Sequence, residues 1–210
     1  MEQYETADGS LTYINEEVGE YYHSKTGARE EAFEKYAKPT MIDRFNKVKI
    51  LDVCFGLGYN SAAALDQFKG EHISIVGLEA DPRIIEEIGN IKAPFLSWEY
   101  IQEVARFGSY EDNERLIELI IGDAREEVKN LIKKGETFDV VFFDPFSPKK
   151  APHMWTQEFF SDIRKVMKPT AILATYSCAS QVRANLRAAG FKVRDGPSVG
   201  RRGPSTLAFA

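Results

Sequence analysis

The sequence predicts a doubly wound α/β domain on a mostly parallel, seven-stranded sheet, with an antiparallel edge strand and a small N-terminal extension. From residue 48 onward, short apolar segments typical of strands alternate with segments of helical periodicity. The central apolar segments lack polar alternation, which indicates strands covered by helices on both faces of a parallel sheet.

The predicted strands, in chain order, cover residues 48–55, 73–80, 116–124, 138–146, 171–177, 191–195 and 205–210. The predicted helices lie near residues 59–68, 82–90, 124–134, 156–167 and 179–189. No helix separates the last two strands, so we expect them to pair antiparallel at the edge of the sheet. Residues 48–210 are therefore predicted to form one domain.

Residues 1–47 have a different pattern and are predicted to form an extension that packs near the site. The segment ETADGSLTYINEE (5–17) carries the Asp-Gly turn of a β-hairpin. The segment GAREEAFEKYAKP (27–39) predicts a helix that ends at Pro39. Residues 91–115 are an insertion before the third strand, with a helix expected around SWEYIQEVARFG (97–108).

Composition places the chain among globular proteins, at 43% hydrophobic and 28% charged residues. No apolar run approaches the roughly 18 residues of a membrane span, and MEQYETADGS lacks the features of a signal peptide. A cytoplasmic location with no membrane partner is expected. Cys54 and Cys178 form no CxxC pattern, and His23 and His153 are not spaced as metal ligands, so neither disulfide framework nor metal is predicted.

The charge is unevenly distributed along the chain. The formal net charge is −5, but residues 145–210 carry 11 Lys and Arg against 3 Asp and Glu, which leaves −13 for the first 144 residues. This asymmetry indicates a region that faces a polyanion beside an acidic body, unless the basic residues only decorate solvated helices.

The carboxyl ends of the predicted strands carry FGLGYN, LEAD, GDAR and DPF. Ligands of doubly wound sheets bind at these ends. Gly56 and Gly58 allow a tight turn and close backbone approach, although such turns also occur in many other strand–helix joints. Glu79 ends the next strand, 23 residues after Gly56, where an acid commonly holds ribose hydroxyls.

The strand ends favour a nucleoside with a cationic centre over a dinucleotide. Ser61 stands where a dinucleotide fingerprint requires its third glycine, and no P-loop lysine is present. Asp123 is suited to accept from an adenine amino group, and Ala124 leaves its backbone N–H free. Successive acids would repel a pyrophosphate but suit the sulfonium of S-adenosylmethionine.

At these residues the chain resembles class I S-adenosylmethionine-dependent methyltransferases and, more closely, the methyltransferase domain of the MnmC family in its stand-alone form. The matching stretches are TADGSLT, EYYHSKTGAREEA, FGLGYN, GLEAD, GDAR, FFDPFSPKKAPHMWTQEFF, LATYSCASQVRANLRAAGF and VGRR. They cover most of the chain outside 91–115, and DPFSPKK-x-P-x-MW is the most specific of them.

The resemblance implies that the chain methylates the exocyclic amine of 5-aminomethyl-2-thiouridine in tRNA, with S-adenosylmethionine as cofactor and the anticodon region of tRNA as partner. Its motifs add Phe55, Asn60 and Ala80 to the cofactor site, and place Tyr22 and His23 at the mouth. The bifunctional form also has a flavin-dependent oxidase domain, for which 210 residues leave no room. A separate enzyme is therefore expected to supply the aminomethyl precursor.

The family's glycine run is incomplete here, because Cys54 stands where its first glycine would be. The turn is then expected to depend on Gly56 and Gly58.

Asp144 is the predicted catalytic residue and is also expected beside the cofactor. An ammonium has no lone pair, so a carboxylate at the fourth strand end must orient the amine or accept its proton. The residues expected to wall or stack a flipped-out base are Pro145, Phe146, Trp155 and Tyr176, with packing beneath the loop as the alternative for the aromatic ones.

Four cations are predicted to contact phosphates, namely Lys149, Lys150, Arg201 and Arg202, with a solvated role as the alternative. Two other functions stay open. A small-amine methyltransferase or aminopropyltransferase would share the strand-end acids, but the GGGDG of aminopropyltransferases is absent. A non-catalytic RNA-binding module on the same fold is the third reading, and the intact acids argue against it.

Overall fold

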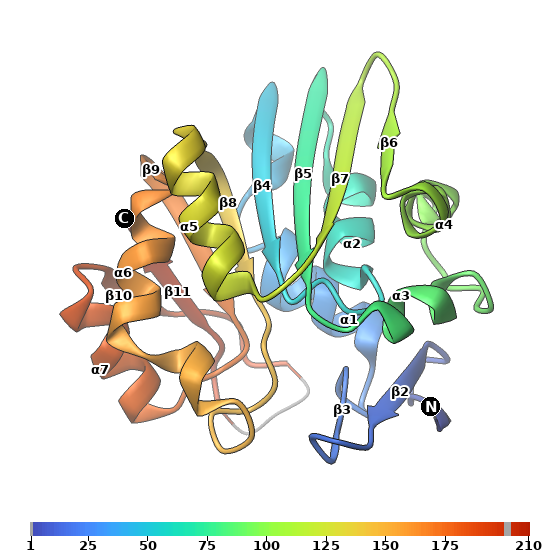
Figure 1. Ribbon diagram of the computed structural model, residues 1–210, viewed down its shortest axis with the longest axis horizontal. Coiled ribbons are helices and arrows are strands. Elements are labelled where there is room, and N and C mark those ends of the chain that lie inside the picture. Colours follow the sequence, from blue (N-terminus) through green and yellow to red (C-terminus); the bar gives the residue numbers. More distant parts are fainter. Residues whose placement is uncertain (1, 200–202) are drawn as a thin grey trace.

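A central sheet organises the computed structural model, which describes residues 2–199 and 203–210 (Figure 1). Within these residues the sheet has eight strands, in the order β10-β11-β9-β8-β4-β5-β7-β6. The strands are β4 (Lys47–Val53), β5 (His72–Glu79), β6 (Ser109–Glu111), β7 (Arg115–Ile121), β8 (Phe138–Phe143), β9 (Met167–Thr175), β10 (Lys192–Asp195) and β11 (Thr206–Phe209).

The predicted fold class is confirmed, with one correction to the number of strands. Strands β9, β8, β4, β5 and β7 are mutually parallel, and β10 and β11 form the expected antiparallel pair. The eighth strand, β6, lies in the insertion and pairs antiparallel with β7. Three residues are too few for hydrophobic periodicity to reveal a strand, so the expected count of seven was one short.

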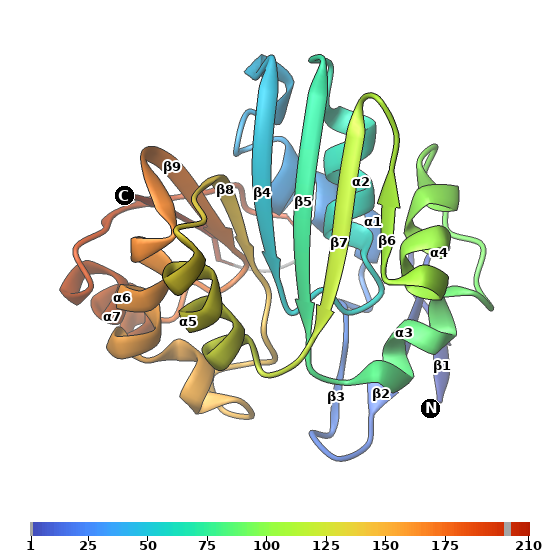
Figure 2. The ribbon, with the colours of Figure 1, turned by 45° about the horizontal axis from the view of Figure 1, so that its top comes forward.

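Helices cover both faces of the sheet, as Figure 2 shows. They are α2 (Tyr59–Gln67), α3 (Pro82–Ile88), α4 (Trp98–Phe107), α5 (Ala124–Lys134), α6 (Gln157–Lys165) and α7 (Ser180–Ala188), with a 3₁₀ turn η3 (Pro152–Trp155) before α6. Neighbouring strand residues enter different cores: Ile50 packs with the α2 and α4 side, and Leu51 with the α5, α6 and α7 side. This explains why β4 is apolar without alternation.

The N-terminal segment forms a second, three-stranded sheet of β1 (Gln3–Glu5), β2 (Leu11–Asn15) and β3 (Glu20–Tyr21). The expected hairpin is present as β1 and β2, and β3 extends it. A helix follows, with α1 (Ala28–Glu31) continuing as a π-helical stretch η1 (Ala32–Ala37), and then a 3₁₀ turn η2 (Ile42–Arg44). Figure 2 shows this sheet beyond the carboxyl ends of β4 and β5.

Asp8 joins the hairpin to the helix that follows. Its Oδ1 accepts from the Thr6 hydroxyl at 2.7 Å and from the Ser10 backbone N–H at 3.1 Å, which closes the turn. Its Oδ2 accepts from the Glu30 N–H at 3.0 Å, and the Ser10 hydroxyl accepts from the Ala28 N–H at 3.1 Å. The turn therefore also caps the helix and fixes its direction toward the main sheet.

In the described ranges, no helix is both long enough and apolar enough to cross a membrane.

Candidate active site

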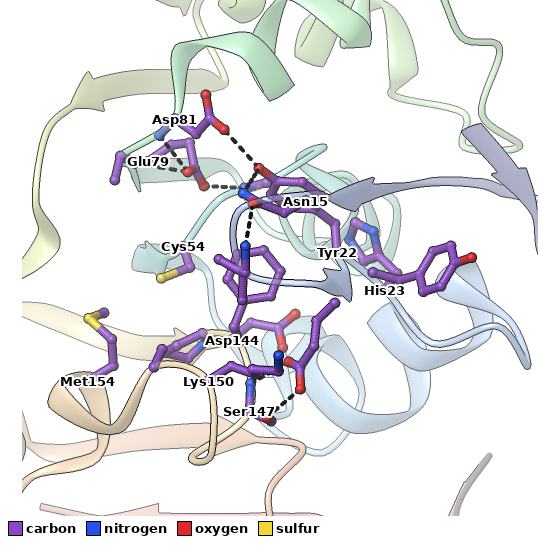
Figure 3. Close-up of a pocket in the computed structure, with 18 of the residues that line it drawn as sticks. Asn15, Tyr22, His23, Cys54, Glu79, Asp81, Asp144, Ser147, Lys150 and Met154 are labelled. Atoms are coloured by element: carbon purple, nitrogen blue, oxygen red, sulfur yellow. Dashed lines mark hydrogen bonds between the residues drawn. The ribbon is translucent and has the colours of Figure 1, made fainter. Parts of the chain in front are cut away.

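A cavity of about 620 Å³ opens at the carboxyl ends of the parallel strands (Figure 3). Two sets of residues face each other across it. We call the first the sheet wall, which comprises Gly56, Glu79, Ala80, Asp123, Ala124 and Asp144. We call the second the N-terminal wall, which comprises Asn15, Glu20, Tyr22, His23 and Glu31.

The glycine turn after β4 forms the base of the cavity on the side of the sheet wall. Gly56 lines the cavity with a φ of +56°, where a side chain would be strained. Gly58 is the N-cap of α2 with a φ of +76°, and an added Cβ would lie 2.8 Å from the Phe55 ring and 2.7 Å from Ile101. Phe55 and Gly58 thus shape the turn from beneath and do not themselves line the cavity.

Cys54 adopts a left-handed conformation, with a φ of +67°. A glycine at this position would adopt it without strain, which explains why the family pattern has glycine there. Burial, together with the negative charges of Glu79 and Asp144, raises the pKa of the Cys54 thiol well above its usual range. The thiol lines the cavity as a neutral, inert group.

Glu79 fastens the glycine turn to the end of β5. Its Oε2 accepts from the Gly56 N–H at 2.9 Å, and its Oε1 accepts from the N–H groups of Ala80 and Asp81, both at 2.9 Å. Burial raises the pKa of this carboxyl, against the three hydrogen bonds that lower it. A cationic or hydroxyl-bearing ligand would compensate a buried acid of this kind.

Asp123 lies in the sheet wall but serves first as the N-cap of α5. It accepts from the Arg125 backbone N–H at 2.9 Å, and it pairs with the Arg125 guanidinium at 2.6 Å. These bonds hold the pKa of Asp123 below its usual value. Ala124 follows at the start of the helix, where backbone N–H groups have no intrahelical partner.

Asp144 follows the last residue of β8 and is held on both carboxylate oxygens. Tyr36 donates its hydroxyl to Oδ1 at 2.6 Å, and Asn60 donates its amide to Oδ2 at 2.9 Å. Burial, followed by the negative charge of Glu31, raises the pKa of Asp144 to about 6. A carboxylate with this pKa is mostly ionised near neutral pH yet is a better proton acceptor than an ordinary aspartate.

Tyr22 and His23 stand in the N-terminal wall, opposite the glycine turn. The Tyr22 hydroxyl donates to Asp81 at 3.2 Å and accepts from the Asn15 amide at 3.1 Å. The His23 ring lies 4.8 Å from that of Tyr59, and burial lowers the pKa of His23 to about 4. The histidine is therefore neutral and adds no positive charge to the cavity.

Glu20 joins the N-terminal wall to the loop after β8. Its carboxylate accepts from the Ser147 N–H at 2.9 Å and from the Ser147 hydroxyl at 2.5 Å. Lys150 of the same loop lines the cavity, and a Cβ on Gly19 would lie 3.4 Å from its Nζ. These contacts connect the small sheet to the loop along one side of the cavity, and we call them the roof; Figure 3 labels Ser147 and Lys150 there.

The aromatic residues of the loop separate into two groups. Phe146 and Tyr176 line the cavity with Pro145; the Phe146 ring lies 5.1 Å from that of Tyr22, and the Tyr176 hydroxyl donates to the Pro145 carbonyl at 3.0 Å. Trp155 is only 3% exposed and lies behind the loop, where its indole N–H donates to the Phe146 carbonyl at 2.9 Å. Trp155 therefore supports the loop and does not wall the cavity.

Other predicted residues lie outside the cavity lining. Asn60 is buried and reaches the cavity only through Asp144, and Lys149 is exposed on the loop. Arg201 and Arg202 lie outside the described residues. Sequence reasoning missed Glu20, Glu31 and Asn15 and the neighbouring Asp81, Ser147 and Tyr36. The available signals were family stretches: EYYHSKTGAREEA contains Glu20 and Glu31, GLEAD contains Asp81, and FFDPFSPKKAPHMWTQEFF contains Ser147.

The cavity is strongly acidic. Among the described residues, six carboxylates line it, namely Glu20, Glu31, Glu79, Asp81, Asp123 and Asp144, against two lysines, Lys25 and Lys150, and His23 is neutral. This donor set, above a glycine turn that leaves room at Gly56, fits a cationic nucleoside such as S-adenosylmethionine. Across residues 2–199 and 203–210, no three His, Cys, Asp or Glu side chains are grouped to hold a metal ion.

Comparisons with known proteins agree with this geometry. Residues 88–210 match the model of a family described as S-adenosyl-L-methionine-dependent methyltransferase. An uncharacterised protein of Methanocaldococcus jannaschii is 36% identical over 212 residues, covering 98% of this chain and 58% of that protein. The bifunctional tRNA 5-methylaminomethyl-2-thiouridine biosynthesis protein MnmC of Pseudomonas fluorescens is 29% identical over 168 residues, covering 70% and 24%.

The crystal structure of MnmC2 from Aquifex aeolicus superposes with a TM-score of 0.82 at 32% identity, covering 99% of this chain and 70% of that one. The chain spans less than two thirds of the length of the two curated relatives. The predicted resemblance to class I methyltransferases and to MnmC is confirmed, and the chain belongs to the S-adenosyl-L-methionine-dependent methyltransferase family.

Proposed function

We propose that this protein N-methylates the aminomethyl group of 5-aminomethyl-(2-thio)uridine at the tRNA wobble position, giving 5-methylaminomethyl-(2-thio)uridine. The observation that carries the proposal is the position of Asp144. It lies in a roofed, acidic cavity beside the glycine turn, with both carboxylate oxygens held and a pKa of about 6. Relatives whose names specify this nucleoside support the choice of substrate.

The sheet wall has the groups needed to hold the methyl donor. S-adenosylmethionine supplies a methyl group on a cationic sulfur, which an amine lone pair displaces. Gly56 leaves room for the donor, Glu79 is suited to its ribose hydroxyls, and Asp123 and Ala124 to its adenine. Asp123 keeps lone pairs for an amino group even while it pairs with Arg125.

Asp144 is the group in the cavity best suited to an incoming amine. An alkylammonium enters an acidic cavity favourably, and it must lose a proton before its nitrogen can attack. Asp144 is suited to accept that proton because the pKa of its carboxyl is raised. The two hydrogen bonds from Tyr36 and Asn60 keep the carboxylate in one orientation. Closure of the cavity over a bound nucleoside would exclude water and protect the neutral amine from reprotonation.

The nucleoside is proposed to reach the cavity as a flipped-out base. Phe146, Tyr176 and Tyr22 present aromatic faces and edges along the side of the cavity that the loop and the small sheet form. Lys149 and Lys150 on the same loop are suited to contact flanking phosphates. A separate enzyme that supplies the aminomethyl precursor, and a cytoplasmic location, stay predictions.

The direct test is methyl transfer to tRNA from a strain that lacks this gene. Purified protein and isotopically labelled S-adenosylmethionine are incubated with that tRNA, and the digested nucleosides are analysed by mass spectrometry. We expect the label in 5-methylaminomethyl-(2-thio)uridine, with loss of the aminomethyl precursor. Parallel reactions with small amines test for a small-amine methyltransferase, and reactions with polyamines and decarboxylated S-adenosylmethionine test for an aminopropyltransferase. Transfer there and not to tRNA would contradict the proposal. Cofactor binding without any transfer would favour the non-catalytic reading.

A further inference from the structure

The N-terminal helix, formed by α1 and η1, contacts the buried side of Asp144 through the hydroxyl of Tyr36. Tyr36 has no exposed surface, its ring packs edge-on against Phe142 of β8 at 5.7 Å, and its hydroxyl donates to Asp144 at 2.6 Å. The same hydroxyl accepts from the Tyr176 backbone N–H at 3.3 Å. The phenol is therefore fixed by the two strands that flank it as well as by its own helix.

A buried ion pair lies on the same helix. Lys35 Nζ and Glu31 Oε1 are 2.5 Å apart, and their side chains are 2% and 12% exposed. Glu31 also lines the cavity and accepts from the Ser24 N–H at 3.3 Å. Replacing a buried ion pair with apolar residues is often neutral or stabilising. The pair is therefore weak evidence for a role in stability, and a functional role is the better explanation.

We propose that Tyr36 is a positioning residue for the Asp144 carboxylate, and that the buried Glu31–Lys35 pair sets the electrostatic balance around the same group. Tyr36 and Asn60 each hold one oxygen, which fixes the plane of the carboxylate and leaves lone pairs on both oxygens for a ligand. The inference deepens the proposed function, since it takes Asp144 as the group that meets the amine.

Charges on the N-terminal helix act on Asp144 in opposite directions. The negative charge of Glu31 raises the pKa of Asp144, and the effect is larger than the opposing one of the Lys35 ammonium. The hydrogen bond from Tyr36 stabilises the ionised carboxylate and lowers its pKa. Three neighbouring side chains of this helix therefore shift the pKa of Asp144, some upward and some downward.

Charged groups also surround Asp144 from other elements: Glu79 and Asp123 of the sheet wall, and Glu20 and Lys150 across the cavity. Asn60 of α2 donates a neutral hydrogen bond. Asp52 and Cys54, on and just after β4, have pKa values that burial raises well above their usual ranges, and the thiol is neutral. Tyr176, after β9, faces Tyr36 with its backbone N–H. These other groups are unchanged in the variants described next, so a difference in the Asp144 titration between variant and wild type reports on the N-terminal helix.

Two variants move this titration in opposite directions. Tyr36→Phe keeps the ring but removes the hydrogen bond, so we expect the Asp144 midpoint to rise by about one pH unit. The double variant Glu31→Gln with Lys35→Met removes both charges without leaving either buried and unpaired. Because the effect of Glu31 is the larger of the two, we expect the midpoint to fall.

The measurement is carboxyl-carbon NMR of the protein labelled at aspartate, titrated without tRNA or S-adenosylmethionine, with the Asp144 signal assigned by its loss in Asp144→Asn. Tyr59→Phe is the matched control, because Tyr59 is equally buried and donates its hydroxyl to the Leu11 carbonyl, not to Asp144. We expect no movement of the Asp144 midpoint in that control. Amide spectra of each variant verify that the fold is kept.

The outcomes separate this inference from the proposed function. A midpoint that fails to rise in Tyr36→Phe overturns the role of Tyr36, and one that fails to fall in the double variant overturns that of the pair. Where the midpoints move as expected but no tRNA is methylated, the proposed function fails and the inference stands. In an active enzyme, the acidic limb of the kcat/KM profile follows the NMR midpoint, whereas a purely structural role would lower activity equally at every pH.

Discussion

The two walls of the cavity differ in how the chain builds them. The sheet wall consists of residues at the ends of parallel strands, where the fold itself brings them together. The N-terminal wall consists of side chains from a small sheet and a helix, which reach the cavity because a turn at Asp8 and a clamp at Glu20 hold them there. One wall follows from topology, and the other from particular hydrogen bonds.

This difference assigns separate tasks to the walls. We propose that Asp144 and Glu79, in the sheet wall, serve the chemistry and the cofactor. We propose that Glu20 and Glu31, in the N-terminal wall, close the cavity and adjust its charge. Changes in the first wall should therefore affect turnover and cofactor affinity strongly, and changes in the second should give smaller, more selective effects.

The largest effect is expected at Asp144. Asp144→Asn keeps the size of the side chain but cannot accept a proton, so we expect turnover to fall by about 10²–10⁴-fold while the affinity for S-adenosylmethionine stays within a few-fold. Label transfer and calorimetry measure the two quantities. Asp162→Asn on α6, outside the cavity, is the control. Near-normal turnover of Asp144→Asn would remove this residue from the chemistry.

The walls should also respond to pH in opposite directions. An unfolded aspartate has a pKa near 4 and folded Asp144 one of about 6, so Asp144 lowers stability by ~3 kcal/mol as pH rises through this interval. The His23 imidazole is protonated below a pH of about 6.5 in the unfolded chain but only below about 4 in the folded protein. The stability that comes from keeping it neutral is therefore lost, by a similar amount, as pH falls from about 6.5 to about 4.

Urea unfolding at pH 4.5 and 7.5 tests this pair. We expect the two contributions largely to offset each other in the wild type. Asp144→Asn should gain stability mainly at pH 7.5, and His23→Gln mainly at pH 4.5. Equal changes at both pH values in either variant would show that the corresponding group does not titrate as described.

A smaller effect is expected from loosening the base of the cavity. Glu79→Gln keeps an oxygen for two of the three N–H donors but offers an amide to the third, so the glycine turn loses one of its anchors. We expect the Kd for S-adenosylmethionine to rise by about tenfold to a hundredfold. Calorimetry against Glu86→Gln, an exposed glutamate on α3, measures it, and an unchanged Kd would refute the assignment to cofactor binding.

The smallest effect is expected in the N-terminal wall. Glu20→Gln weakens both bonds to Ser147 without creating space, so the roof should open more often. We expect KM for tRNA to rise about threefold, with the Kd for S-adenosylmethionine unchanged. Glu16→Gln, exposed in the same hairpin, is the control. A change in cofactor affinity equal to that in KM would mean that the two walls do not divide the tasks.

Much of the sheet wall could be predicted from the sequence, and little of the N-terminal wall. Hydrophobic periodicity locates strand ends, and parallel strands end at one edge, so Gly56, Glu79 and Asp144 followed without coordinates. Glu20 and Ser147 are 127 residues apart, and no local pattern indicates that they meet. Their contact depends on tertiary packing of the small sheet.

The aromatic loop marks a second limit. Phe146 and Trp155 belong to the same motif, yet one faces the cavity and the other is buried behind it. The 3₁₀ turn Pro152–Trp155 rotates the indole inward onto Phe143, at 5.2 Å between the rings. Composition and spacing do not encode that rotation. Asp123 illustrates the same limit, because its cap and its pair with Arg125 are local choices that strand-end position alone leaves open.

The π-helical stretch at Ala32–Ala37 makes the position of Tyr36 sensitive to the number of residues in one helical turn. Lys38 donates its N–H to the Phe33 carbonyl, five residues back, so this turn holds one residue more than an α-helical turn would. Deleting one residue here, such as Glu34, would place Lys38 four residues after Phe33, so the same bond would close an ordinary α-helical turn and the helix on either side would keep its alignment. Tyr36 lies inside this turn and would shift from its place against β8. The number of residues in this turn, as well as their identity, therefore limits which insertions and deletions the protein tolerates.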